Sequence, residues 1–109
     1  MINSRTIMLF KRGACLVNIA RGGLIEGLDL LVQAIESGSL AGVGLDVFEP
    51  EPPNFNHPLF RLPNCLTTPH ALATTTGAMF KVFKSMAEDM AAVLNGRRPR
   101  FVVNPEVFR

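Results

Sequence analysis

Three short apolar runs, at residues 14–19, 42–47 and 65–68, are each followed at once by turn-forming residues. The first run does not alternate between apolar and polar residues, so it predicts a parallel strand covered on both faces. Residues 28–35 then place apolar side chains at helical spacing, and Gly38 supplies a left-handed stop. Strand, helix, strand, loop and strand is the pattern of an α/β fold with one parallel sheet and right-handed crossovers.

The rest of the chain predicts two further helices, a loop and an extended tail. We expect a short helix over residues 3–11. The stretch between the second and third runs is rich in proline, so it is a loop with at most one helical turn near Leu59. The longest helix is expected over residues 74–96, and residues 99–109 are expected to be extended. Along this helix, apolar side chains recur at spacings of four and three, which predicts a core-facing stripe of Met79, Phe83, Met86, Met90 and Val93.

Length, composition and charge indicate one ordinary globular domain. The chain has 109 residues, of which 48% are hydrophobic and 18% charged, and the formal net charge of +2 is too small to indicate nucleic-acid binding. No run approaches the roughly 18 apolar residues that span a bilayer, and the first residues do not resemble a signal peptide. We expect a cytoplasmic protein that binds neither nucleic acid nor membrane, with Cys15 and Cys65 as buried, reduced thiols.

Two ionisable residues follow or end the first two predicted strands. Arg21 precedes two glycines, and its planar fork fits a carboxylate, although a surface Arg at a turn is the alternative. Asp46 ends an apolar strand, where a carboxylate is costly unless it meets donors. It either caps local backbone or receives an amide of a ligand.

A carboxylate and an imidazole complete the group of candidate residues. Glu51 stands between two prolines that restrict its backbone, and Glu49 is its competitor. His70 follows a proline at the end of the third strand and is better placed than His57, which we expect in solvent. A lone His is commonly structural, but the nearby carboxylate and Arg favour proton transfer on an anionic substrate. Because ligands bind outside the carboxyl ends of parallel strands, we expect these groups to point into one crevice.

The motifs that carry these residues have a known counterpart. In order, Asn18-x-x-Arg21-Gly22, Asp46-Val47-Phe48-x-x-Glu51-Pro52 and Thr68-Pro69-His70 closely resemble the carboxyl-terminal half of the nucleotide-binding domain of D-isomer-specific 2-hydroxyacid dehydrogenases. That family includes phosphoglycerate dehydrogenase, glyoxylate and hydroxypyruvate reductases, formate dehydrogenase and D-lactate dehydrogenase. The resemblance implies a partial Rossmann-like, doubly wound parallel sheet of about three strands with crossover helices. Residues 1–109 would form a single partial domain, with the substrate domain absent apart from segment 97–109 returning toward it.

The resemblance also implies a role for each candidate residue. Arg21 would bind the substrate carboxylate and keto oxygen, and Glu51 would pair with His70, which would exchange a proton with a small 2-hydroxy or 2-oxo acid. Ala20, Arg21, Asp46 and His70 would lie at the nicotinamide end of NAD or NADP, and no metal is implied. We expect a homo-oligomer, because residues 14–19 would leave a strand edge unpaired.

The departures from the family pattern limit these roles. This sequence contains neither the GxGxxG turn nor the acid that would select NAD over NADP, so we expect the 109 residues alone to be inactive and to bind NAD weakly or not at all. Ala71-Leu72-Ala73 follows His70, where the family usually has Ile and then small residues. The rival hypothesis is a non-catalytic binding or scaffold protein, as in the family's transcriptional corepressors, or a degenerate fragment. The sequence does not choose among phosphoglycerate, glyoxylate, hydroxypyruvate and lactate as the substrate.

Overall fold

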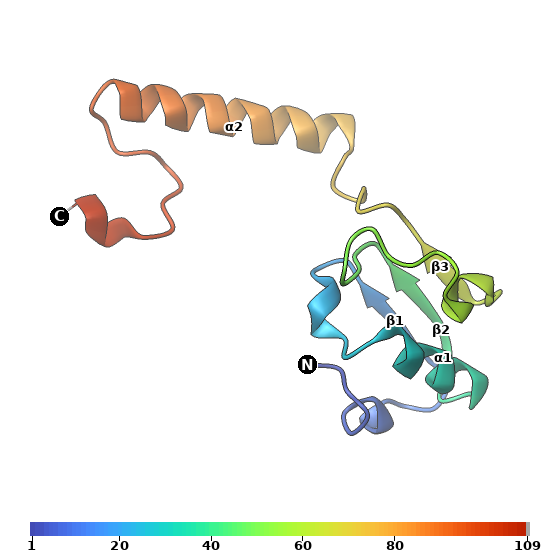
Figure 1. The fold of residues 1–109 in the computed structure, drawn as a ribbon. Helices are drawn as coiled ribbons and strands as arrows, with labels where there is room; N and C mark the ends of the chain where they lie inside the picture. The colour runs from blue at the N-terminus through green and yellow to red at the C-terminus, as the bar shows by residue number, and fades with distance from the viewer. Residues whose placement is uncertain (109) are drawn as a thin grey trace. The chain divides into compact units, whose positions relative to one another are not determined.

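The computed structural model describes residues 1–108, and Figure 1 follows the chain through them. By its internal contacts the chain divides after Leu72 into two compact units. The first unit contains a three-stranded sheet and one α-helix, and the second contains the long helix and the carboxyl-terminal segment. The predicted α/β fold is therefore confirmed, and the single partial domain over residues 1–109 stays a prediction.

The sheet of the first unit is parallel throughout. Its strands are β1 (Ala14–Asn18), β2 (Leu40–Leu45) and β3 (Cys65–Thr67), in the order β1-β2-β3. Val43 of β2 lies opposite Leu16 of β1 and opposite Cys65 of β3. All three strands predicted from apolar runs are present, and their carboxyl ends meet at one edge of the sheet, where the loops with the candidate residues begin.

The core of the first unit lies on the face of β2 that carries Val43 and Leu45. Helix α1 (Leu28–Glu36) packs there with Leu31 fully buried, and the 3-10 helix η3 (Pro58–Arg61) adds the fully buried Leu59. Each fully buried Leu side chain stabilises the fold by about 1.5–3 kcal/mol relative to an exposed one. The predicted stop at Gly38 is confirmed by its positive φ of 69°.

The opposite face of the sheet is exposed, which corrects one prediction. Val17 of β1 is 66% exposed and Leu66 of β3 is 72% exposed, so the strands are not covered on both faces within this chain. Cys15 lies on the same exposed face and is not buried as predicted, because the core of this unit gathers on the other face. Cys65 is partly buried, and burial raises the pKa of its thiol.

The amino-terminal segment forms less helix than the sequence predicts. A 3-10 helix, η1 (Ile7–Leu9), replaces the expected helix over residues 3–11. The Asn3 side-chain oxygen accepts hydrogen bonds from the backbone N–H groups of Arg5 and Thr6, at 3.1 and 2.9 Å, which is the geometry of a helix N-cap. The segment then continues with the three-residue bonds of a 3-10 helix, from the Leu9 N–H to the Thr6 oxygen and from the Phe10 N–H to the Ile7 oxygen.

The second unit is built on α2 (Thr76–Leu94), whose position agrees with the prediction. Thr75 caps the helix, since its hydroxyl accepts a hydrogen bond from the backbone N–H of Ala78. No residue of α2 is buried, so the predicted core stripe is wrong within this chain; Phe83, for example, is 60% exposed. A 3-10 helix, η4 (Pro105–Phe108), interrupts the predicted extended tail, and Arg109 lies outside the described residues. Among residues 1–108, no helix is both long and apolar enough to cross a membrane.

Candidate active site

The turn after β1 presents Arg21 and is organised by a buried amide. Asn18 is 6% exposed, and its side-chain nitrogen donates to the backbone oxygen of Arg21 at 2.8 Å while its oxygen accepts from the backbone N–H of Ala20 at 3.1 Å. The Arg21 guanidinium is exposed and donates from Nη1 to the backbone oxygen of Ala20 at 2.7 Å. The ordering role of Asn18 was not predicted, although a polar residue ending an apolar strand was the available signal.

Gly22 brings this turn against the loop that follows β2. A Cβ atom on Gly22 would lie 2.0 Å from the backbone carbonyl carbon of Phe48 and 2.2 Å from its oxygen. No side chain fits there, so glycine is what permits the two backbones to touch. Arg21 is thereby fixed beside the loop that carries Glu51.

Asp46 lies inside the fold and holds the loop that follows β3. It is 4% exposed, and its Oδ1 accepts from the Thr68 hydroxyl at 2.5 Å and from the backbone N–H of Ala71 at 2.8 Å. Its Oδ2 accepts from the backbone N–H of Leu72 at 3.2 Å. These bonds, the Thr68 hydroxyl first, lower the pKa of the Asp46 carboxyl, and the charge of His70 adds to the effect while burial opposes it.

These contacts correspond to the backbone-capping alternative that the sequence left open for Asp46. An ionised carboxylate accepts about four hydrogen bonds. The three bonds described therefore leave capacity for one further donor, and the contact of Asp46 with an amide of a ligand stays a prediction.

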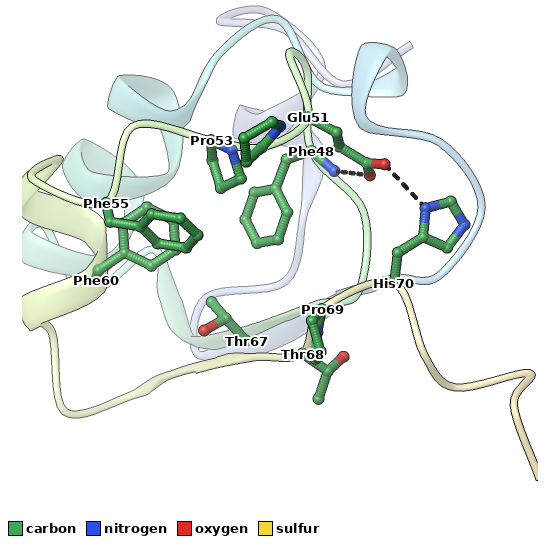
Figure 2. A pocket seen from close by; sticks show the side chains of 10 residues that line it. Phe48, Glu51, Pro53, Phe55, Phe60, Thr67, Thr68, Pro69 and His70 are labelled. Carbon is green, nitrogen blue, oxygen red and sulfur yellow. Dashed lines mark hydrogen bonds and ion pairs between the residues drawn. The ribbon is translucent and has the colours of Figure 1, made fainter.

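Glu51 and His70 form a hydrogen-bonded pair in the lining of a hollow, as Figure 2 shows. Oε2 of Glu51 lies 3.0 Å from Nδ1 of His70, and Oε1 accepts from the backbone N–H of Phe48 at 2.9 Å. The His70 bond is the main cause that lowers the pKa of Glu51, with the Phe48 N–H second and the Arg21 charge a smaller contribution. Glu51, and not its competitor Glu49, is the carboxylate that reaches His70.

The pair determines which atom of His70 can exchange a proton. Because the pKa of Glu51 is lowered, chiefly by the His70 bond, its carboxylate is ionised at neutral pH and accepts at Oε2, so Nδ1 of His70 carries a hydrogen and acts as the donor. The second nitrogen, Nε2, is then the atom that gains or loses a proton. In Figure 2 it points away from Glu51 and Phe48. The His70 backbone has a φ of 54°, which is uncommon for a residue other than glycine.

The hollow beside the pair is lined mainly by aromatic rings and prolines. It has a volume of about 500 Å³ and is lined by Phe48, Phe55 and Phe60, and the Phe60 ring packs against the other two with centroid distances of 5.7 Å to Phe48 and 5.6 Å to Phe55. Glu51 and His70 belong to its lining, whereas Arg21 and Asp46 do not. We predicted that all the candidate groups would point into one crevice, and this hollow does not collect them all. Asp46 is buried, and Arg21 lies on the adjoining turn.

His57 is not the solvated side chain that the sequence predicts. Its ring is 18% exposed, Nε2 lies 3.0 Å from Oδ1 of Asp29, and Nδ1 accepts from the backbone N–H of Leu59. It caps η3, and this structural role explains its burial. Within residues 1–108, no three His, Cys, Asp or Glu side chains are grouped in a way that could hold a metal ion.

Comparison with known proteins points to one family. The family described as D-isomer specific 2-hydroxyacid dehydrogenase, NAD binding domain, matches residues 1–71. The glyoxylate reductase of Thermococcus gammatolerans is 41% identical over 109 residues, which is all of this chain and 32% of that protein. The D-3-phosphoglycerate dehydrogenase of Archaeoglobus fulgidus is 42% identical over 94 residues, which is 86% of this chain and 18% of that protein. The chain thus spans about a third of the length of the first of these relatives.

Solved structures agree with these matches. The D-lactate dehydrogenase of Lactobacillus jensenii with NAD⁺ has a TM-score of 0.80 and 29% identity, covering 94% of this chain and 34% of that one. A D-isomer specific 2-hydroxyacid dehydrogenase from Xanthobacter autotrophicus in complex with NADPH has a TM-score of 0.77 and 30% identity. The match covers 99% of this chain and 34% of that one. The predicted partial Rossmann-like sheet is therefore confirmed, and both cofactors, NAD and NADP, occur among the structural neighbours.

Proposed function

Because the chain belongs to the D-isomer specific 2-hydroxyacid dehydrogenase family, we propose that it supplies the proton-transfer and substrate-anchoring residues of an NAD(P)-dependent oxidoreductase. The substrates are small 2-hydroxy acids and the corresponding 2-oxo acids. The observation that carries this proposal is the bond between Oε2 of Glu51 and Nδ1 of His70, because it orients an imidazole for proton transfer from Nε2.

His70 is the general acid and base of the proposed reaction. In reduction, Nε2–H of the protonated ring donates its proton to the oxygen of the 2-oxo group, and in oxidation Nε2 accepts the proton of the 2-hydroxyl. The ionised Glu51 carboxylate favours the protonated imidazole electrostatically and fixes its orientation. The hydride is supplied or taken up by the nicotinamide when the cofactor is bound.

Arg21 is the proposed anchor for the substrate carboxylate. Its guanidinium is exposed on a turn held against the Glu51 loop by Gly22, and its charge contributes to lowering the pKa of Glu51. A planar guanidinium binds a carboxylate through two parallel hydrogen bonds, which also sets the orientation of the acid.

Asp46 and Ala20 are the proposed contacts for the nicotinamide amide of NAD or NADP. Asp46 is ionised, with capacity for one donor beyond the Thr68, Ala71 and Leu72 bonds, which suits an amide N–H₂ group. Ala20 would contribute backbone atoms on the adjacent turn.

A chimera provides the test, because the alignment with the T. gammatolerans glyoxylate reductase covers all 109 residues of this chain. The chain replaces the aligned segment of that enzyme, and oxidation of NADH or NADPH is followed with glyoxylate, hydroxypyruvate and pyruvate. We expect turnover of at least one 2-oxo acid, and a loss of about 10²–10⁴-fold in the His70→Gln variant. A folded chimera that binds cofactor without turnover, or a His70→Gln variant with normal turnover, would contradict the proposal and favour a binding or scaffold role.

A further inference from the structure

We propose that Thr68 is a positioning residue that, together with Asp46, holds His70 in the left-handed backbone conformation from which its ring reaches Glu51. The contribution to catalysis rests on the proposed function. We call the hydrogen bonds that join Thr68 and the residues after His70 to Asp46 the clamp, and they are a property of the folded chain. Neither the sequence motifs nor the family comparison assigns a role to the Thr68 hydroxyl.

The backbone of His70 needs external support. A φ of 54° is sparsely populated for residues other than glycine, and such a conformation persists where the surroundings fix it. The ring of His70 is half exposed, with 49% of the side chain accessible, so packing around the ring is not sufficient to determine its backbone angle. The hydrogen bonds of the neighbouring residues are the stronger determinant.

Those hydrogen bonds close on one carboxylate from both sides of His70. Thr68, two residues before it, donates its hydroxyl to Oδ1 of Asp46 at 2.5 Å. Ala71 and Leu72, one and two residues after it, donate their backbone N–H groups to the two oxygens of the same carboxylate at 2.8 and 3.2 Å. Residues on both sides of His70 are therefore bound to the Asp46 carboxylate, while His70 itself reaches Glu51 through its ring.

Asp46, which accepts these hydrogen bonds, is buried at the end of a strand. Asp46 is 4% exposed and directly follows β2, and its backbone N–H donates to the backbone oxygen of Asn18. The Thr68 backbone N–H continues the sheet by donating to the Leu45 oxygen at 2.9 Å, so the backbone of Thr68 is fixed and its hydroxyl points at the carboxylate. A hydroxyl bound to an ionised carboxylate is a strong hydrogen bond in a partly buried setting. Losing it should loosen the loop before His70 while leaving the sheet intact.

The first test follows the Glu51 carboxyl by ¹³C NMR during an acid titration of the full 109-residue chain. Its pKa is lowered mainly by the His70 bond, so any change that moves His70 away must raise the titration midpoint. We expect Thr68→Val, which keeps the shape of the side chain but removes the hydroxyl, to raise the midpoint toward that of His70→Ala. Thr68→Ser restores the hydroxyl and should return the midpoint to the parent value. Thr67→Val, the same change one residue earlier, is the matched control and should have no effect.

A second measurement avoids acid and needs neither substrate nor cofactor. At a pH high enough for the ring to be neutral, the ¹⁵N shifts of the His70 ring report which nitrogen carries the hydrogen, and we expect Nδ1 in the parent and Thr68→Ser. In Thr68→Val and in the smaller Thr68→Ala, we expect a shift of the hydrogen toward Nε2 as the Glu51 contact is lost.

The proposal would be overturned if the titration midpoint of Glu51 and the tautomer of the His70 ring stayed at their parent values in both Thr68→Val and Thr68→Ala. An equal response to Thr67→Val would also overturn it, since the effect would then not be specific to the Thr68 hydroxyl. Because these readouts are independent of turnover, an inactive chimera would contradict the proposed function without touching this result.

Discussion

The closest backbone approach in the candidate site gives the strongest single prediction. Replacing Gly22 by Ala places a methyl carbon 2.0 Å from the Phe48 carbonyl carbon, 2.2 Å from its oxygen and 2.5 Å from the Glu49 nitrogen. All three atoms are backbone, so no side-chain rotation relieves the overlap, and the turn must move away from the loop. Overpacking of this kind costs about 1–3 kcal/mol. With a urea m-value of about 1–3 kcal/mol/M, the unfolding midpoint should fall by roughly 1 M.

The neighbouring glycine supplies the matched control. A Cβ on Gly23 would lie 3.9 Å from Oε2 of Glu49, an ordinary contact, so Gly23→Ala should change stability by less than about 0.5 kcal/mol. Because the chain has no Trp or Tyr, urea unfolding is best followed through the NMR amide signals of β2. Equal midpoints for the two variants would refute the claim that the Arg21 turn is held by direct backbone contact.

Three further predictions concern charge and the free edge of the sheet. In the chimera, Glu51→Gln is expected to move the alkaline limit of 2-oxo acid reduction to lower pH, because the carboxylate favours the protonated imidazole; an unchanged pH–rate profile would show that Glu51 only shapes its loop. The pKa of Asp46 is lowered in the fold, so its contribution to stability is complete above the ordinary pKa of about 3.9 and is lost as pH falls through the folded value. The protection factor of the Leu72 amide should then fall below about pH 4 before those of the β2 amides do, whereas a simultaneous fall would argue against the loop-holding role. The isolated chain should self-associate along β1, whose Val17 is 66% exposed, and Val17→Lys should reduce the mass measured by light scattering while Val103→Lys, at another exposed valine, should not.

The sequence predicts those parts of the fold that depend on local pattern. Apolar runs of strand length give β1, β2 and β3 within two residues, and the Thr cluster before the long apolar stripe gives the start of α2 at Thr76. Their signals, strand-length hydrophobicity and a helix N-cap, are carried by adjacent residues. The Glu51–His70 contact follows from the meeting of strand ends at one edge of a parallel sheet together with the family resemblance.

Burial was predicted less well, because it depends on what lies next to an element and not on the element itself. The apolar side chains of α2 and the outer face of β1 have the composition of a core, yet Phe83 and Val17 are more than half exposed in this chain. In the opposite direction, His57 has the sequence context of a solvated loop but is covered because Asp29 of α1 and the N–H of Leu59 bind its two ring nitrogens. In both cases burial is decided by which tertiary contacts are present or absent, such as the contact of His57 with Asp29, 28 residues away in the sequence.

The roles of the candidate residues stay predictions, and some contacts among these residues could be read only from the structure. A carboxylate that ends a strand was correctly singled out, but the choice between ligand binding and backbone capping needed the bonds from Thr68, Ala71 and Leu72 to Asp46. Similarly, the two glycines after Arg21 look equivalent in the sequence. Only the distances to Phe48 show that the first of them is essential to the contact between the two loops.

A calorimetric titration with NAD tests the central claim most directly. The chain carries the residues proposed for the nicotinamide end of the cofactor and no GxGxxG turn, which in dinucleotide folds binds the pyrophosphate at a helix amino terminus. The isolated 109-residue chain should therefore show weak or no saturable binding of NAD. The chimera that adds the missing segments should bind NAD or NADP. As a control, the Thr67→Val variant of the chimera should keep the same affinity. Micromolar affinity for NAD in the isolated chain would contradict the view that it forms only part of a dinucleotide-binding domain.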